Sequence, residues 1–157
     1  MPDNEIVENL TRDLGAKAFE ITNPAIRRIF LKVAPADLVP TVTVLRDSYD
    51  CAFLSTITGL DKGEAFEIIY HFASPVTTIH VRTEIPRSDP RLPSICSAIP
   101  GAVLYEREIQ EMFGIVVEAI PDPRRLNQPD DWPDGQYPLR KDWKHTRPQE
   151  VIPGGKS

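Results

Sequence analysis

The sequence predicts an α+β protein: a small, mostly antiparallel sheet with helices on one face, followed by an extended, proline-rich C-terminal strap. Three runs in the middle of the chain show the two-residue alternation of β-strands. Segments on both sides of them carry apolar residues at helical spacing. Seven of the sixteen prolines follow Ala119, where no regular period is visible. We therefore expect an α+β domain at residues 1–118 and a tail at residues 119–157.

The N-terminal part of the domain predicts two helices. Residues 3–14 carry apolar residues every three or four positions, and Asp3 or Asn4 is expected to cap this helix. Residues 36–46 show the same spacing after Pro35, which is suited to the start of a helix. Both helices are expected to pack on the sheet.

Two short strands are expected between these helices. Residues 18–22 alternate weakly, and residues 28–33 alternate clearly between apolar and polar side chains. Asn23 and Pro24 predict the turn between them.

The central sheet is expected to consist of three antiparallel strands at residues 52–59, 65–72 and 76–84. Residues 61–63 read Asp-Lys-Gly, which is typical of the turn in a β-hairpin. A short helix over residues 92–99 is expected to follow.

The last helix is expected to run from about Tyr105 to Gly114. Its apolar stripe consists of Tyr105, Ile109, Met112 and Phe113, at spacings of four, three and one residues. Gly114 stands where helices commonly end in the left-handed conformation.

Charged residues fill the rest of this helix. Arg107 and Glu111 lie in the polar arc, whereas Glu106 and Glu108 lie at the margins of the apolar stripe. Carboxylates in such marginal positions need cationic or hydrogen-bonding partners. The alternative is a solvated face with an Arg107–Glu111 pair, which would stabilise the helix by only a few tenths of a kcal/mol.

The tail combines prolines with large apolar side chains and charges of both signs, which is unlike a flexible linker. Fully extended at about 3.3 Å per residue, residues 121–142 would reach roughly 60–70 Å. Such a segment is suited to lying along the surface of another protein. The alternative is a disordered tail.

Composition excludes several classes of function. The net charge of −5 and the absence of a basic patch argue against nucleic-acid binding. No run approaches the roughly 18 apolar residues of a membrane span, and the N-terminus lacks the apolar core of a signal peptide, so export is not expected. Cys51 and Cys96 have no further ligands at metal-binding spacing, and we expect free thiols. His71 and His80 are expected to be structural.

A series of short motifs between Glu106 and Asp142 resembles the signature of the 30 kDa subunit of respiratory complex I, which is shared with the small subunits of membrane-bound energy-converting hydrogenases. In order, the motifs are Glu106-Arg107-Glu108, Glu111-Met112-Phe113-Gly114-Ile115, Pro121-Asp122 with Arg124-Arg125, Pro129-Asp130-Asp131-Trp132, and Pro138-Leu139-Arg140-Lys141-Asp142. The resemblance extends upstream in length and in the order of elements.

The resemblance implies a non-catalytic scaffold subunit that binds no cofactor itself. Its implied partners are the hydrogenase-like large subunit, of the 49 kDa type, and the small Fe–S subunit. Fe–S clusters, and in hydrogenases a NiFe site, are expected in those partners. The implied location is cytoplasmic, peripheral on the inner face of the cell membrane, reached through the complex.

The partner interface implied by this resemblance comprises one helix face and the tail. Its expected residues are Glu106, Arg107, Glu108, Glu111, Phe113, Pro121, Asp122, Arg124, Arg125, Asp131, Trp132, Pro138, Leu139, Arg140, Lys141 and Asp142. The arginines would bind carboxylates or backbone oxygens of the partner, and the aromatic and leucine side chains would be apolar anchors.

Two other functions remain open from the residues alone. Glu106, Glu108 and Glu111 together could bind a divalent metal ion in a carboxylate-based enzyme. Alternatively, the tail could be a generic protein-binding adaptor unrelated to redox chemistry. Co-purification with a hydrogenase-like large subunit would separate these hypotheses.

Overall fold

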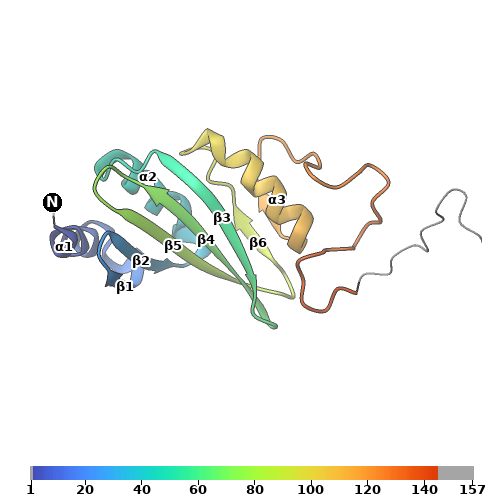
Figure 1. Cartoon of the computed structure of the whole chain (residues 1–157), viewed down its shortest axis with the longest axis horizontal. Helices are drawn as coiled ribbons and strands as arrows, with labels where there is room; N and C mark the ends of the chain where they lie inside the picture. The colour runs from blue at the N-terminus through green and yellow to red at the C-terminus, as the bar shows by residue number, and fades with distance from the viewer. Residues whose placement is uncertain (1, 145–157) are drawn as a thin grey trace, which may run out of the picture.

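Five strands form one mixed sheet in the order β1-β2-β5-β4-β3 (Figure 1). Their bounds are β1 Ala18–Ala25, β2 Arg28–Val33, β3 Phe53–Asp61, β4 Ala65–Ala73 and β5 Thr78–Pro86. Neighbouring strands are antiparallel except β2 and β5, which run parallel. The structure is a computed structural model, and it describes residues 2–144.

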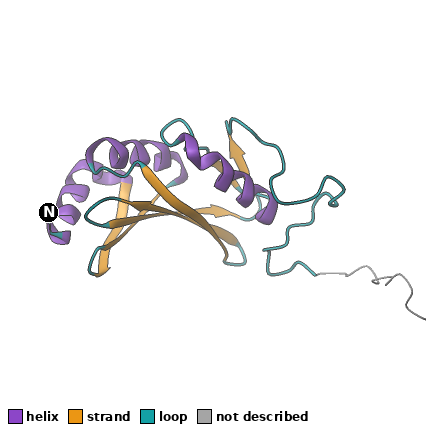
Figure 2. Cartoon of the chain, turned by 45° about the horizontal axis from the view of Figure 1, so that its top comes forward, coloured by secondary structure: helices purple, strands orange, loops and turns teal. Residues whose placement is uncertain are grey.

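The helices lie along one face of this sheet, as the sequence predicts (Figure 2). They are α1 Asp3–Leu14, α2 Leu38–Ser48 and α3 Val103–Phe113. Single 3₁₀ turns at Gly15–Lys17, Pro35–Asp37 and Pro100–Ala102 flank them. A small parallel pair, β6 Arg91–Pro93 with β7 Val116–Glu118, connects the main sheet to the segments before and after α3.

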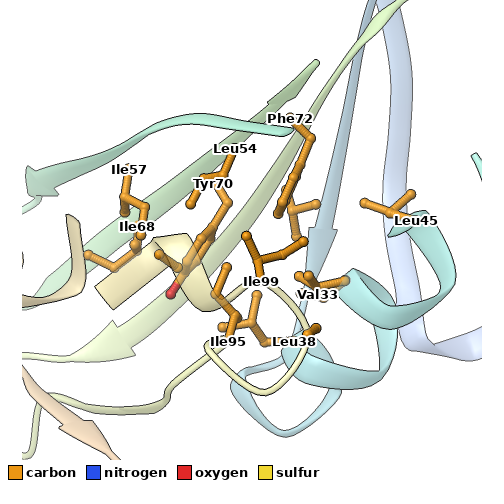
Figure 3. Close-up of a cluster of buried hydrophobic side chains, with 14 of the residues drawn as sticks. Val33, Leu38, Leu45, Leu54, Ile57, Ile68, Tyr70, Phe72, Ile95 and Ile99 are labelled. Carbon is orange, nitrogen blue, oxygen red and sulfur yellow. The ribbon is translucent and has the colours of Figure 1, made fainter. Parts of the chain in front are cut away.

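The core is the layer between the sheet and the helices. Alternate residues of β4 face it, and Phe66, Ile68, Tyr70 and Phe72 are all fully buried. Figure 3 shows Tyr70 among buried side chains from β2 and β3, from α2 and from the segment between β6 and α3. On the opposite face, β5 carries the half-buried polar side chains of Thr78, His80, Arg82 and Glu84. This one-sided alternation is the pattern of an antiparallel sheet that is covered on one face only.

The first two strands extend the sheet beyond the three strands that were expected to form its core. Ile29 and Leu31 of β2 pair with Ile79 and Val81 of β5, and all four side chains are buried. The parallel pairing is possible because α2 and the β3–β4 hairpin lie between the two strands in the chain.

The turn predicted at Asn23 and Pro24 was wrong. Both residues belong to β1, and the chain turns at Ile26 and Arg27. Proline is tolerated there because β1 is an edge strand whose pairing with β2 is interrupted by two register shifts.

Two further predictions were wrong: the side-chain cap on α1 and the helix over residues 92–99. Pro2 occupies the N-cap position, and the Asp3 carboxylate accepts the Arg27 backbone N–H at 2.6 Å instead. After β6 the chain makes only one turn, because the Ile95 N–H donates to the Glu106 carboxylate at 2.7 Å. Ile95 nevertheless points into the core as expected (Figure 3).

Candidate partner interface

The helix α3 is formed and ended as its sequence predicts. Ile109 and Phe113 are buried, whereas Tyr105 and Met112 are half-buried against the core. Gly114 ends the helix in the left-handed region with φ 68°, and its N–H donates to the Gln110 carbonyl at 2.9 Å.

The polar face of α3 is covered by the chain's own tail. Arg107 donates from Nε to the Arg124 carbonyl at 2.6 Å and from a terminal nitrogen to the Arg125 carbonyl at 2.5 Å. Its other terminal nitrogen lies 3.2 Å from the Asp122 carboxylate. The side chain is consequently only 11% exposed. A guanidinium that spans two main-chain carbonyls fixes the direction of the chain.

Glu111 binds the next residues of the tail as a hydrogen-bond acceptor, whereas Arg107 is a donor. Its two carboxylate oxygens accept the backbone N–H groups of Leu126 and Asn127. Gln128 then donates from its side-chain amide to the Glu111 carbonyl at 3.0 Å. The Arg107–Glu111 pair is therefore not formed, because each side chain is occupied by the main chain of the tail.

A second attachment lies at the C-terminal end of α3. The Leu139 N–H donates to the Met112 carbonyl at 3.1 Å, and Arg140 Nε donates to the Phe113 carbonyl at 2.7 Å. The Arg140 guanidinium lies 4.4 Å from the centre of the Tyr137 ring. These carbonyls belong to the last turn of the helix, which lacks partners within the helix itself.

Asp61, at the end of β3, fixes the last part of the described tail. Its carboxylate accepts the Lys141 N–H at 2.9 Å, the Gly63 N–H at 2.8 Å and a bond from Arg87 at 2.8 Å. Burial alone would raise the pKa of Asp61, but these donors outweigh it and lower the pKa to about 2. Arg87 also pairs with Asp142 at 2.6 Å.

The intervening loop is closed by two tryptophans. Their rings stack with centres 6.3 Å apart, and both indole N–H groups donate to Gln136 at 2.9 Å. Trp132 donates to the Gln136 main-chain oxygen and Trp143 donates to its side-chain oxygen. Arg125 donates to the Trp132 carbonyl at 3.0 Å, so the loop is tied to the segment beside α3.

The extended strap is not confirmed. Residues 119–144 contain no helix or strand, as their prolines predict, but they loop past the C-terminal end of α3 and return to the β3–β4 hairpin (Figure 1). The rest of the tail, residues 145–157, lies outside the described residues.

Three of the predicted interface residues are buried: Glu111, which the tail covers, and also Glu106 and Phe113. Glu106 is fully buried and accepts bonds from Ser94 Oγ at 2.6 Å, the Ile95 N–H at 2.7 Å and Cys96 Sγ at 3.2 Å. Burial raises the pKa of its carboxyl group, although these donors oppose the shift. Phe113 is 4% exposed and packs against Phe66. Glu106 is buried because the apolar face of α3 extends beyond the predicted stripe to include it, whereas Phe113 is a member of that stripe.

The other predicted residues, apart from Glu111, lie at or near the surface of the α3–tail region, and the role of the whole set at a partner interface stays a prediction. The exposed ones are Glu108, Pro121, Arg124, Asp131, Leu139, Lys141 and Asp142. Those that are half-buried within the chain are Arg107, Asp122, Arg125, Trp132, Pro138 and Arg140, and Glu111 is buried.

Sequence reasoning missed three residues that shape this surface: Leu60, Asp61 and Arg87. Leu60 is 43% exposed and lines an open groove with Leu139, which is 55% exposed. The Asp-Lys-Gly motif marked Asp61 only as a turn residue, because the tail residues that Asp61 and Arg87 bind lie 80 and 55 positions away in the chain.

The part of the chain that the structure describes contains no cluster of three or more His, Cys, Asp or Glu side chains suited to a metal ion. Cys51 and Cys96 are both free and buried, as expected. None of the helices in residues 2–144 combines the length and apolar character needed to cross a membrane.

The fold and this surface define an α+β domain whose C-terminal segment is fixed against its own last helix. Residues 31–149 match the family model of the respiratory-chain NADH dehydrogenase 30 Kd subunit, and the chain belongs to this family. The match includes the sheet from β2 onward, α3 and most of the tail.

Similar proteins include an NADH-quinone oxidoreductase subunit of Mesorhizobium japonicum, which is 34% identical over 133 residues, 81% of this chain and 65% of that protein. The subunit of the same name in Rhizobium rhizogenes is 33% identical over 156 residues, 94% of this chain and 76% of that protein. Formate hydrogenlyase subunit 5 of Escherichia coli is 50% identical over 64 residues, 41% of this chain and 11% of that protein. The chain thus spans 65% of the length of the Mesorhizobium relative.

Two solved structures share the fold. A chain of the membrane-bound sulfane sulfur reductase, an archaeal respiratory membrane complex, superposes with a TM-score of 0.80 at 26% identity, covering 90% of this chain and 85% of that one. The trypsin-resistant fragment of Nqo5 superposes with a TM-score of 0.63 at 24% identity, covering 78% of this chain and 99% of the fragment.

Proposed function

We propose that this chain is a non-catalytic structural subunit of a multi-subunit, membrane-associated oxidoreductase, of the complex I or energy-converting hydrogenase type. It docks on the hydrogenase-like large subunit of that complex and contacts the small Fe–S subunit. The family membership supports this role, as do relatives named as subunits of NADH-quinone oxidoreductase and formate hydrogenlyase.

The observation that carries the proposal is the way α3 holds the tail. Arg107 and Glu111 bind four main-chain groups of residues 124–127, so this segment has a defined path before any partner is present. A surface that is ordered in advance loses less conformational entropy on binding. The exposed side chain of Arg124 in this segment, and that of Leu139, whose N–H is bound to the Met112 carbonyl, are then available to a partner.

The same contacts weigh against a carboxylate-based enzyme. Of the three glutamates that could form a metal site, Glu106 is buried among Ser94, Ile95 and Cys96, while Glu111 is bound to backbone N–H groups. Only Glu108 is exposed. In this proposal the chain binds no cofactor, and the Fe–S clusters, with NiFe in hydrogenases, belong to the partner subunits.

In this proposal the chain reaches the cytoplasmic face of the membrane through its partners.

The test is to co-express the tagged chain with the large and Fe–S subunits of its own complex and to measure the amount of large subunit that is recovered with it. Leu139→Asp is expected to lower that amount at least tenfold, because a charge would be buried in the contact.

The matched control is Ile26→Asp, which changes a side chain that is 88% exposed at the turn between β1 and β2. It is expected to co-purify like the wild type. The proposal is overturned if the large subunit does not co-purify with the wild type, or if the purified chain alone catalyses a redox or hydrolytic reaction.

A further inference from the structure

The strand β3 forms one edge of the sheet, and its outward-facing backbone can be identified from its pairing with β4. The Lys62 N–H donates to the Ala65 carbonyl at 2.9 Å, so these two residues form a hydrogen-bonded pair. Hydrogen-bonded and non-hydrogen-bonded pairs alternate along an antiparallel ladder. The regular register from Asp61 back to Ile57 therefore turns the N–H and C=O groups of Ile57, Gly59 and Asp61 away from β4.

The outward groups of Ile57 and Gly59 have no hydrogen-bond partner in the part of the chain that the structure describes. Within residues 2–144, no backbone or side-chain hydrogen bond involves the main-chain N–H or C=O of Ile57 or Gly59 on this side. The helix α3 packs on the core face of β3, where Phe113 lies against Gly59, and so leaves the edge itself unpaired. An unpaired edge is a template for another strand.

The side chains along this edge do not protect it. Residues 53–60 of β3 read FLSTITGL, without charge or proline, and the charged residue at the end of the strand, Asp61, is buried and paired with Arg87. Phe53 is 67% exposed and Leu60 is 43% exposed. Charges, prolines and bulges are the usual means by which edge strands avoid pairing, and β3 has only one register shift, between Leu54 and Thr56.

The opposite edge of the same sheet is protected by all of these means. The strand β1 contains Glu20, which has a positive φ of 53°, and Pro24, which cannot donate to a ladder. Its pairing with β2 is also interrupted by two register shifts. The contrast within one sheet indicates that β3, unlike β1, is kept suitable for pairing.

We propose that an extended segment of the partner polypeptide adds to β3 as a sixth strand of the sheet. This inference rests on the proposed function, because the segment belongs to the large subunit on which the chain docks. The groove beside β3 is lined by Leu60 together with Leu139 and Lys141 of the tail, so the added strand would be continuous with the tail surface. The chemistry of β3 fits an uncharged segment with an apolar residue opposite Leu60.

Amide hydrogen exchange tests this pairing directly. In the isolated chain the amides of Ile57 and Gly59 are expected to exchange rapidly, because they face solvent. In the purified complex their exchange is expected to slow at least tenfold, while peptides of β1 remain unchanged. Unchanged exchange of residues 53–61 in a complex that is otherwise intact overturns the strand addition and leaves the proposed function standing.

A pair of matched variants tests the same contact by assembly. Thr56→Lys with Leu60→Lys places two charges along the β3 edge and is expected to lower co-purification of the large subunit at least tenfold. Phe19→Lys with Thr22→Lys places two charges on exposed residues of β1 and is expected to have no effect. Equal co-purification of both variants overturns strand addition, whereas absence of the large subunit even with the wild type overturns both proposals.

The alternative occupant of the edge is a second copy of this chain. Sedimentation of the isolated chain is expected to show a monomer at concentrations where the complex is stable. A dimer that the Thr56→Lys and Leu60→Lys changes disrupt would assign the edge to self-association and overturn the proposal.

Discussion

Arg140 donates from Nε to the main-chain carbonyl of Phe113 at 2.7 Å, which joins the tail to the last residue of α3. The approach is close because Gly114 has no side chain: a Cβ there would lie 2.5 Å from the Tyr137 ring and 2.8 Å from the Arg140 guanidinium. The glycine that ends the helix therefore also makes room for the tail. Arg140, which was expected to bind a partner, therefore binds the main chain of its own protein.

Arg140→Ala is expected to loosen the end of the described tail without unfolding the domain. The change removes one hydrogen bond and the stacking on Tyr137, which together contribute about 1–2 kcal/mol. The amides of Leu139 and Lys141, which donate to Met112 and Asp61, should exchange roughly tenfold faster in the isolated chain.

The control for this measurement is Arg12→Ala, whose guanidinium is 71% exposed and contacts the adjacent Asp13. Its effect on exchange in the tail should be nil. If Arg140→Ala leaves the Leu139 and Lys141 amides as protected as before, the attachment to Phe113 does not hold the tail.

Glu111→Gln is expected to release the segment that follows Asp122. The amide would present one acceptor where the carboxylate presents two, and the charge-assisted bonds to Leu126 and Asn127 would be lost. Trypsin should then cleave after Arg124 and Arg125 several-fold faster than in the wild type, since cleavage requires the backbone to leave α3. Glu108→Gln, on the exposed side of the same helix, should be cleaved at the wild-type rate.

The strands and helices with regular alternation or spacing were predictable because each sequence pattern is local. In residues 28–33, the alternation of neighbouring side chains predicts burial on one face of the strand. In α3, Gly114 directly after the last apolar residue predicts the left-handed end of the helix. The helix predicted over residues 92–99 was wrong because its backbone conformation depends on a contact with a distant residue. Their backbone is occupied by Glu106, which no local pattern indicates.

The site was predictable only in part, for the same physical reason. The charged motifs were correctly singled out as needing partners, but the sequence does not say whether those partners lie in the same chain. Arg107 and Glu111 bind residues 15 to 18 positions downstream, and Asp61 binds Lys141 from 80 positions away. Such contacts follow from the path of the folded chain.

Glu106→Ala is expected to destabilise the whole domain by about 2–4 kcal/mol. The change leaves the Ile95 N–H and the Ser94 hydroxyl without their acceptor in a buried site and also opens a cavity. Urea denaturation at neutral pH measures the loss. Glu108→Ala, two residues away and exposed, should change the free energy of unfolding by no more than about 0.5 kcal/mol. Equal effects of the two changes would contradict the buried role of Glu106.

His71 and His80, on the open face of the sheet, are expected to make stability fall on acidification. Their Nδ1 atoms lie 2.7 Å apart, so one nitrogen must donate and the other accept. Protonation of the accepting Nδ1 would place a donor on both nitrogens and break the bond. Burial lowers the pKa of both rings, and for His80, with His71 and Arg28 adding to the effect, to about 4 from the ordinary 6.5.

The free energy of unfolding falls on acidification because the unfolded chain binds more protons than the folded protein. Between pH 6.5 and about 4 the unfolded chain holds a proton on His80 that the folded protein does not, so the contribution of the neutral ring is complete above pH 6.5 and is lost as the pH falls through this window. The free energy of unfolding should drop by on the order of 1 kcal/mol between pH 7 and pH 5. Glu106 acts in the opposite direction, because its pKa is raised. The test is therefore the difference between the wild type and the double variant His71→Gln with His80→Gln, which should lose the drop; identical pH profiles for the two proteins would show that the histidine pair does not cause it.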